Sequence, residues 1–185
     1  MNPPNTSREE IMRVSRKIAS EKGLPALNMR ALAKECGIAP GTLYNYYSDK
    51  DELVVAAIES VWQDILEKSA PDSGGRFSQY ITQTYAHIIE KLKDYPDFLA
   101  AHSISVAGSV KGKARGMMER CFGKIRGELH EVLLNDKSVD RSVFSDIFRE
   151  EDLIEHILDT ITISIINGKP DCAVLTEILD RLLYR

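Results

Sequence analysis

The chain has 185 residues, 43% of them apolar and 28% charged, with a formal charge of −4 at pH 7. This composition is ordinary for a folded domain, and the length argues against a TIM barrel or a large two-domain enzyme. A chain of this size buries about 70% of the surface that its unfolded form exposes, so disulfide bonds are not needed for stability.

The acidic average hides a division of charge near residue 50. Residues 1–50 contain eight Lys or Arg against five Asp or Glu, a net charge of +3, so the remaining 135 residues carry −7. The average argues against a histone-like nucleic-acid binder, which needs many cations close to phosphates. A basic end on an acidic chain nevertheless indicates a part that faces nucleic acid joined to a different part.

The cysteines and the N-terminus indicate the cellular compartment. Cys36, Cys121 and Cys172 form no close pair and leave an odd count, which suits a reducing compartment, and we expect them to be buried packing residues. The N-terminus has no basic region followed by an apolar one, and no stretch approaches ~18 consecutive apolar residues. We therefore expect a cytoplasmic protein without a membrane segment.

Helical periodicity begins shortly after the N-terminus. Ser7 stands three residues before Glu10, the spacing of a capping box, and Gly23 is expected to end the first helix. Asn28 is a suitable cap for a second, short helix, which Gly37 stops.

The next two helices are also predicted from their first residues. Pro40 suits the first turn of a third helix, which is expected to run to about Tyr46. Asp49 is expected to cap a longer fourth helix over residues 49–68. Turn-forming residues over 70–75 then indicate a linker.

The middle of the chain is less regular. A helix is predicted from Phe77 to Leu92, and another starts at Pro96. Five of the 11 glycines lie in residues 108–127, which indicates a loop followed by a helix through Met117 and Val132. Residues 136–149 are typical of a connection with a short helix over 143–148.

One segment near the C-terminus has two interpretations. Residues 160–165 alternate with period two and are rich in β-branched side chains, as in a strand. Helical spacing from Asp152 onward and the lack of a partner strand favour a helix, which Asn167 and Gly168 end. Pro170 is expected to open the last helix. The predicted fold class is all-α, with about nine helices.

Two short helices joined by a tight turn, over 28–36 and 40–46, have the dimensions of a helix-turn-helix. The second begins with small side chains at 39–41, so its backbone N–H groups can approach a phosphate closely. The polar residues that follow include Thr42 and Asn45. Such side chains are unusual in a purely structural helix of seven residues.

At this point the chain resembles the tetracycline-repressor (TetR) family of bacterial transcriptional regulators. The resemblance runs from Arg8 to Leu53, about a quarter of the chain, and includes 28–33, 37–47 and Lys50. The family often has His where Tyr46 stands and Phe at the next position. The resemblance implies residues 1–52 as a DNA-binding domain and 53–185 as a ligand-binding and dimerisation domain.

The resemblance and the side-chain chemistry together predict the contacts with duplex DNA. Arg30 is expected to bind guanine or a phosphate, and Thr42 and Asn45 to face base edges. A solvated charge for Arg30, and helix capping or simple exposure for the other two, remain alternatives. Tyr44, Tyr46 and Lys50 are expected on phosphates. The full predicted set is Asn28, Arg30, Pro40, Gly41, Thr42, Tyr44, Asn45, Tyr46 and Lys50.

The resemblance further implies a pocket for a small-molecule effector of unknown identity. Amphipathic and polarisable side chains suit a mostly apolar ligand, although ordinary core packing is the alternative for each of them. The predicted lining residues are Trp62, Tyr80, Tyr85, His87, Phe98, His102, Met117, Cys121 and Phe122.

A homodimer is expected because helix-turn-helix proteins read two half-sites about 34–36 Å apart. The resemblance implies an interface on the last two helices, which are richly aliphatic, and monomer core is the alternative. The predicted interface residues are Ile154, Ile157, Leu158, Ile161, Ile165, Leu175, Ile178, Leu179 and Leu182.

Patterns of enzymes and metal sites are incomplete. His130 and Glu131 begin a zinc-protease motif, but residue 134 is Leu, so the second histidine is missing. Residues 107–113 approach a phosphate-binding loop, but Ala114 supplies no hydroxyl. We therefore expect no catalytic residue, metal or cofactor.

The sequence as a whole predicts a homodimeric transcriptional repressor that a small molecule releases from its operator. The alternative is an architectural or protein-recruiting DNA-binding protein of the same fold that has no effector. Activation in place of repression also stays open.

Overall fold

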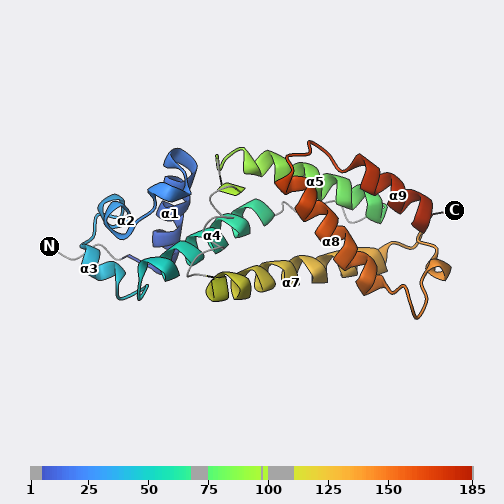
Figure 1. Ribbon diagram of the computed structural model, residues 1–185, viewed down its shortest axis with the longest axis horizontal. Helices are drawn as coiled ribbons and strands as arrows, with labels where there is room; N and C mark the ends of the chain where they lie inside the picture. Colours follow the sequence, from blue (N-terminus) through green and yellow to red (C-terminus); the bar gives the residue numbers. More distant parts are fainter. Residues whose placement is uncertain (1–5, 68–74, 97, 100–110, 185) are drawn as a thin grey trace. The chain divides into compact units, whose positions relative to one another are not determined.

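The computed structural model describes residues 6–67, 75–96, 98–99 and 111–184. Within these ranges it has eight α-helices, two short 3₁₀-helices and no strand, which confirms the all-α class (Figure 1). Residues 160–165 are helical, so the strand interpretation is wrong. In the part of the chain described, no helix has the length and apolar character needed to cross a bilayer.

The chain forms two compact units. Unit 1 comprises Met1–Leu66 with Lys91–Cys121, and unit 2 comprises Glu67–Glu90 with Phe122–Arg185. The functional division at residues 52 and 53 remains a proposal.

Unit 1 begins with α1 (Arg8–Lys22), a 3₁₀-helix (Leu24–Ala26), α2 (Met29–Glu35), α3 (Pro40–Leu43) and α4 (Lys50–Leu66). Apolar side chains at helical spacing meet between these helices because each helix presents one apolar stripe. The buried set includes Ile11, Val14, Ile18, Leu32, Leu43, Leu53, Ala57, Ile58 and Val61.

The predicted caps of unit 1 are present. Ser7 Oγ accepts from the Glu10 backbone N–H at 3.1 Å, although the Glu10 carboxylate pairs with Arg13 instead of completing a capping box. Asp49 Oδ1 accepts from the Glu52 N–H at 2.7 Å. Gly23 ends α1 with φ of +76°, a backbone conformation that glycine adopts without a steric cost. Local side-chain chemistry thus sets where these helices begin and end.

One boundary in unit 1 differs from the prediction. The α-helical part of α3 ends at Leu43, and turns complete the segment to Tyr46 because Asn45 and Tyr46 donate to carbonyls three residues back. The helix α7 (Lys111–Asn135) begins within the glycine-rich residues 108–127 and runs through Met117 and Val132 as predicted. Phe98 and Leu99 are helical as predicted, and residues 68–74, 97 and 100–110 lie outside the described residues.

Unit 2 contains α5 (Phe77–Leu92) up to Glu90, the second part of α7, α8 (Glu150–Ile166) and α9 (Ala173–Leu183). Its core is formed by the apolar stripes of these four helices. The buried set includes Phe77, Ile81, Tyr85, Ile88, Leu129, Leu133, Leu153, Ile157, Ile161, Leu179 and Leu183.

Two elements of unit 2 also correct the prediction. The expected helix over 143–148 is instead a 3₁₀-helix at Arg141–Val143, because Asp140 accepts from the Ser142 backbone and side chain. The last helix begins at Ala173 and not at Pro170, because Asp171 accepts the Ala173 N–H at 3.0 Å and holds the preceding residues in a turn. Asn167 and Gly168 end α8 as predicted, with φ of +66° at the glycine.

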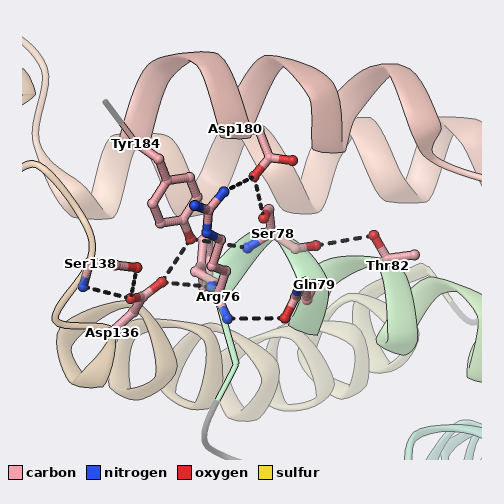
Figure 2. A network of polar contacts seen from close by, with 9 residues as sticks. Arg76, Ser78, Gln79, Thr82, Asp136, Ser138, Asp180 and Tyr184 are labelled. Carbon is pink, nitrogen blue, oxygen red and sulfur yellow. Dashed lines mark hydrogen bonds and ion pairs between the residues drawn. The ribbon is translucent and has the colours of Figure 1, made fainter.

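A polar cluster joins three distant segments of unit 2 (Figure 2). Asp136 is 9% exposed and accepts from the Phe77 backbone N–H at 2.8 Å, from the Tyr184 hydroxyl at 2.7 Å and from both donors of Ser138. The carboxylate therefore caps the N-terminus of α5 from another element and fixes the end of the chain beside it. Ser78 donates to Asp180 Oδ1 at 2.6 Å in the same cluster.

The cysteines only partly match the expectation of burial. Cys172 is buried, whereas Cys36 and Cys121 are half-buried. Burial raises the pKa of all three cysteine thiols.

Candidate nucleic-acid interface

The turn between α2 and α3 sets the angle of the two short helices. Gly37 has φ of +66°, and Ile38 donates from its backbone N–H to the Ala33 carbonyl at 3.0 Å. This is the hydrogen-bonding pattern of a helix that ends at a left-handed glycine. The glycine allows the chain to leave α2 and begin α3 within four residues.

Buried anchors hold the second helix and its following turn against the core. Leu43 is fully buried, and Tyr47 is 2% exposed. On the other side, Pro40, Gly41 and Asn45 are exposed, and Tyr44 is 56% exposed. The segment therefore has one face fixed in unit 1 and one face of backbone, phenol and amide groups open to a partner.

Gly41 lies at the second position of α3. A Cβ built at this residue meets no heavy atom within 4 Å, and its φ is an ordinary one. The fold of the chain therefore does not require a glycine there. A partner that approaches the backbone closely does require one.

Three of the predicted DNA-contacting side chains are partly occupied within unit 1, either by hydrogen bonds or by burial. Asn28 caps α2, since its Oδ1 accepts from the Ala31 N–H at 2.9 Å while its Nδ2 donates to the Ala26 carbonyl. Tyr46 is half-buried, and its hydroxyl donates to the Thr6 carbonyl at 2.5 Å. Thr42 is half-buried between the anchored and the exposed face.

The predicted cations remain exposed. Arg30 stands on α2, and Lys50 is the first residue of α4. Neither takes part in an ion pair with another described residue. Both charges are therefore available to an anionic partner.

Sequence reasoning missed the role of Arg8. Its Nη2 donates to the Tyr46 carbonyl at 2.7 Å, and its guanidinium lies 5.0 Å from the centre of the Tyr47 ring. Arg8 thus ties the start of α1 to the end of the segment that carries Tyr44 and Asn45. No local pattern reports a contact between residues 38 positions apart.

The predicted effector residues fall in both units. In unit 1, Trp62 and Phe98 meet edge to face with ring centres 5.3 Å apart, and Cys121 Sγ lies 4.0 Å from Met117 Sδ. In unit 2 the predicted residues are Tyr80, Tyr85, His87 and Phe122, of which the first two are buried. His102 lies outside the described residues.

One side chain of this set has a clear structural role. The Tyr85 hydroxyl donates to the Lys169 carbonyl at 2.8 Å, and so holds the turn between α8 and α9 against α5. Its polar end is therefore already used within unit 2.

The predicted dimer residues are mostly core of the single chain. Seven of them are no more than 7% exposed, because the apolar stripes of α8 and α9 face the interior of unit 2; these are Ile154, Ile157, Leu158, Ile161, Ile165, Leu175 and Leu179. Leu182 is half-buried, and Ile178 is 54% exposed. Other large apolar side chains on these helices are exposed instead, namely Ile163, Ile166 and Val174.

Comparison with known protein families gives a match for the N-terminal region. Residues 11–57 match the model for bacterial regulatory proteins of the tetR family. The HTH-type transcriptional regulator UidR of Escherichia coli (strain K12) is 33% identical over 79 residues, which are 42% of this chain and 40% of UidR. The chain thus spans less than half the length of this curated relative.

Solved structures resemble a larger part of the chain. A transcriptional regulator from Rhodococcus sp. Rha1 has a TM-score of 0.60 at 20% identity, over 89% of this chain and 86% of that one. BioQ with its double-stranded DNA operator gives 0.53 at 18% identity, covering 90% and 88%. FadR from Bacillus subtilis in complex with stearoyl-CoA gives 0.53 at 17% identity, covering 95% and 97%. At these identities the likeness concerns the fold.

Proposed function

We propose, because residues 11–57 match the model for bacterial regulatory proteins of the tetR family, that the chain is a transcriptional regulator of this family that binds an operator as a homodimer and leaves it when a small molecule binds. The observation that carries the proposal is the two-faced segment after Gly37. Leu43 and Tyr47 anchor it, while Gly41, Tyr44 and Asn45 are presented outward.

The proposed division of labour on DNA follows from side-chain chemistry. Asn45 carries an amide that can pair with an adenine edge in the major groove, and Thr42 supplies a hydroxyl and a methyl group. We assign Arg30, Tyr44 and Lys50 to contacts with phosphates, which fix the register of the protein on the duplex. Pro40 and Gly41 allow the α3 backbone to come close.

The proposed dimer surface is the exposed apolar part of α8 and α9. Ile166 and Ile178 are 63% and 54% exposed, as is usual for side chains that a partner covers. A dimer brings two helix-turn-helix segments to two half-sites of DNA. A monomer with few cations is expected to bind DNA only weakly. Replacing both isoleucines by Asp is expected to give a monomer in analytical ultracentrifugation.

Ile147 provides a matched control for that experiment. It is 94% exposed but lies in the loop between α7 and α8. The Ile147→Asp variant is therefore expected to remain a dimer. A dimer that persists in the double variant places the interface elsewhere.

The proposed effector site lies on the aromatic and sulfur side chains of unit 1. Trp62 and Phe98 form one contact, and Met117 and Cys121 another. Fatty acyl-CoA thioesters are the first compounds to test, because a protein of similar fold, FadR of Bacillus subtilis, was solved with stearoyl-CoA. Trp62 is the only tryptophan, so its fluorescence reports binding in unit 1 directly.

A gel shift on the intergenic DNA beside the gene, with and without candidate compounds, tests binding and release together. We expect a specific protein–DNA complex that dissociates when an effector is added. Such an effector must bind more tightly to the state of the protein that does not bind DNA. A specific complex that no compound alters supports the architectural or protein-recruiting alternative. No preference for this DNA over random duplex contradicts the proposed regulator.

A further inference from the structure

Most cations near the N-terminus are engaged inside unit 1. Each of the engaged side chains lies within 4 Å of a carboxylate oxygen, so its charge is balanced locally. The pairs are Arg8 with Glu52, Arg13 with Glu10, Arg16 with Asp64, Lys17 with Glu21 and Lys22 with Glu35. Of the eight cations in residues 1–50, this leaves Arg30, Lys34 and Lys50 without an ion pair among the described residues.

Lys34 shares a face of α2 with Arg30. The two residues are four positions apart, so they stand about 6 Å from each other along the helix axis on the same side. Both are exposed, whereas Met29, Leu32 and Ala33 turn the opposite side of α2 into the core. The exposed side of α2 therefore carries two positive charges in line.

The carboxylate next in sequence to Lys34 is hydrogen-bonded to a different lysine. Glu35 accepts a hydrogen bond from Lys22 Nζ at 3.2 Å, and this bond and the charge of Lys22 lower the pKa of Glu35. The negative charge of Glu35 is thus balanced by Lys22 on α1. Lys34, at the end of α2, adds to the lowering of this pKa through its charge but forms no ion pair with a described residue.

We propose that Lys34 binds a DNA phosphate. With Arg30 and Lys50 it is then the third cation by which each subunit contacts the duplex. The proposal rests on the proposed function and extends its set of contacts by one residue. The first helix of a helix-turn-helix crosses the sugar-phosphate backbone, which is where Arg30 and Lys34 stand. A lysine ammonium is a flexible point charge and suits a phosphate without requiring exact geometry.

A purely structural role for Lys34 makes a different prediction. A cation in the last turn of a helix is stabilised by the partial negative charge of the helix end. In that case, replacing Lys34 lowers thermal stability and leaves DNA binding unchanged. Measuring both quantities on one variant separates the two roles.

The test is the salt dependence of binding to a random-sequence duplex, measured for the wild type, Lys34→Gln and Lys17→Gln. Lys17→Gln removes the same charge from an exposed residue that is already paired with Glu21. Each phosphate contact contributes about 0.9 to the slope of log Kobs against log[salt], so Lys34→Gln is expected to flatten the slope of a dimer by about 1.8. With affinity at 1 M salt unchanged, this is roughly 60-fold weaker binding at 0.1 M salt.

Two results overturn the proposal. One is a slope for Lys34→Gln equal to that of the wild type, and the other is an equal flattening for Lys17→Gln, which reveals a general effect of net charge. The experiment uses random duplex, so it does not depend on an operator. An unchanged slope therefore contradicts the role of Lys34 alone, whereas the proposed regulator is tested separately by the gel shift on intergenic DNA.

Discussion

Tyr95 donates its phenolic hydrogen to Asp64 Oδ2 at 2.9 Å, and the same carboxylate faces two cations. Arg16 Nε lies 3.9 Å from Oδ1, and Lys91 Nζ lies 3.8 Å from Oδ2. Arg16 belongs to α1, Asp64 to α4 and Lys91 to the last turn of α5. A single carboxylate therefore joins α1 to α4 and to the segment before Phe98.

A double-mutant cycle measures this connection. Tyr95 is 6% exposed, and burial together with the bond to Asp64 raises the pKa of its hydroxyl, which therefore stays a neutral donor at pH 7. We expect Tyr95→Phe and Asp64→Asn each to lower the free energy of unfolding by about 1 kcal/mol, and their effects to be non-additive by at least about 0.5 kcal/mol. Urea denaturation at pH 7 gives all four values. Strict additivity contradicts a direct coupling.

Local features of the fold were predictable from the sequence because they depend on neighbouring residues. Ser7, Asn28 and Asp49 each accept a backbone N–H three residues ahead, and Gly23 and Gly37 end helices in a conformation that other residues avoid. A three-residue spacing is visible in a printed sequence. The helix-turn-helix could be located for the same reason.

Contacts between distant residues left no such signal. Arg8 and Tyr46 are 38 positions apart, and Tyr95 and Asp64 are 31 apart, so neither bond has a local pattern. The apolar stripe of α8 shows a second limit. Periodicity finds an apolar face but does not tell whether the same chain or a second copy covers it, and Ile157 is fully buried in unit 2.

Asn45→Ala tests direct reading of a base. The side chain is exposed and can pair bidentately with adenine, so its loss is expected to cost roughly 1–3 kcal/mol at one base-pair position of the operator. Binding to random duplex stays unchanged. The measurement is a competition gel shift against operators with single base changes, and an equal loss on operator and random DNA removes Asn45 from the residues that read sequence.

Gly41→Ala and Gly37→Ala separate an approach by DNA from a requirement of the fold. A Cβ at Gly41 meets open space, so Gly41→Ala is expected to keep or slightly raise stability while weakening DNA binding by a clash with the duplex. Gly37 has φ of +66°, so Gly37→Ala is expected to lower stability by about 1 kcal/mol. Thermal unfolding and gel shifts on both variants check this. Undiminished DNA binding by Gly41→Ala excludes a close approach at this residue.

Tyr44→Phe and Tyr46→Phe form a matched pair that removes one hydroxyl each. A phenol has one hydrogen to donate, phosphate oxygens only accept, and the hydrogen of Tyr46 is already given to the Thr6 carbonyl. We expect Tyr46→Phe to lower stability by about 1 kcal/mol and to spare DNA affinity. Tyr44→Phe, at an exposed residue, is expected to weaken binding to operator and random duplex alike. If Tyr46→Phe weakens DNA binding and Tyr44→Phe does not, Tyr46 contacts a phosphate, as the sequence predicts.

Asp136 makes the stability of unit 2 depend on pH. Burial raises the pKa of this carboxyl, but hydrogen bonds from Ser138, Tyr184 and the Phe77 backbone outweigh burial and hold its pKa below the ordinary value. Burial and the bond to Asp136 raise the pKa of Tyr184 to about 12, so the tyrosine remains a donor throughout. A carboxyl whose pKa is lowered on folding stabilises the folded state above its unfolded pKa, and this contribution is lost as pH falls through the folded value.

Asp136→Asn is therefore expected to lower the free energy of unfolding by about 2 kcal/mol at pH 7, since a buried acceptor of four hydrogen bonds loses its charge. The difference from the wild type should begin to shrink below about pH 4, where the carboxyl of the unfolded chain becomes protonated, and should disappear as pH falls through the lower pKa of the folded state. Asp180→Asn is the control, because its side chain lies in the same cluster but is 43% exposed, and it should cost less than about 1 kcal/mol. Urea denaturation from pH 3 to 7 measures the free energy of unfolding of the wild type and both variants. If the difference between the wild type and Asp136→Asn does not change with pH, the charge of Asp136 does not contribute to stability.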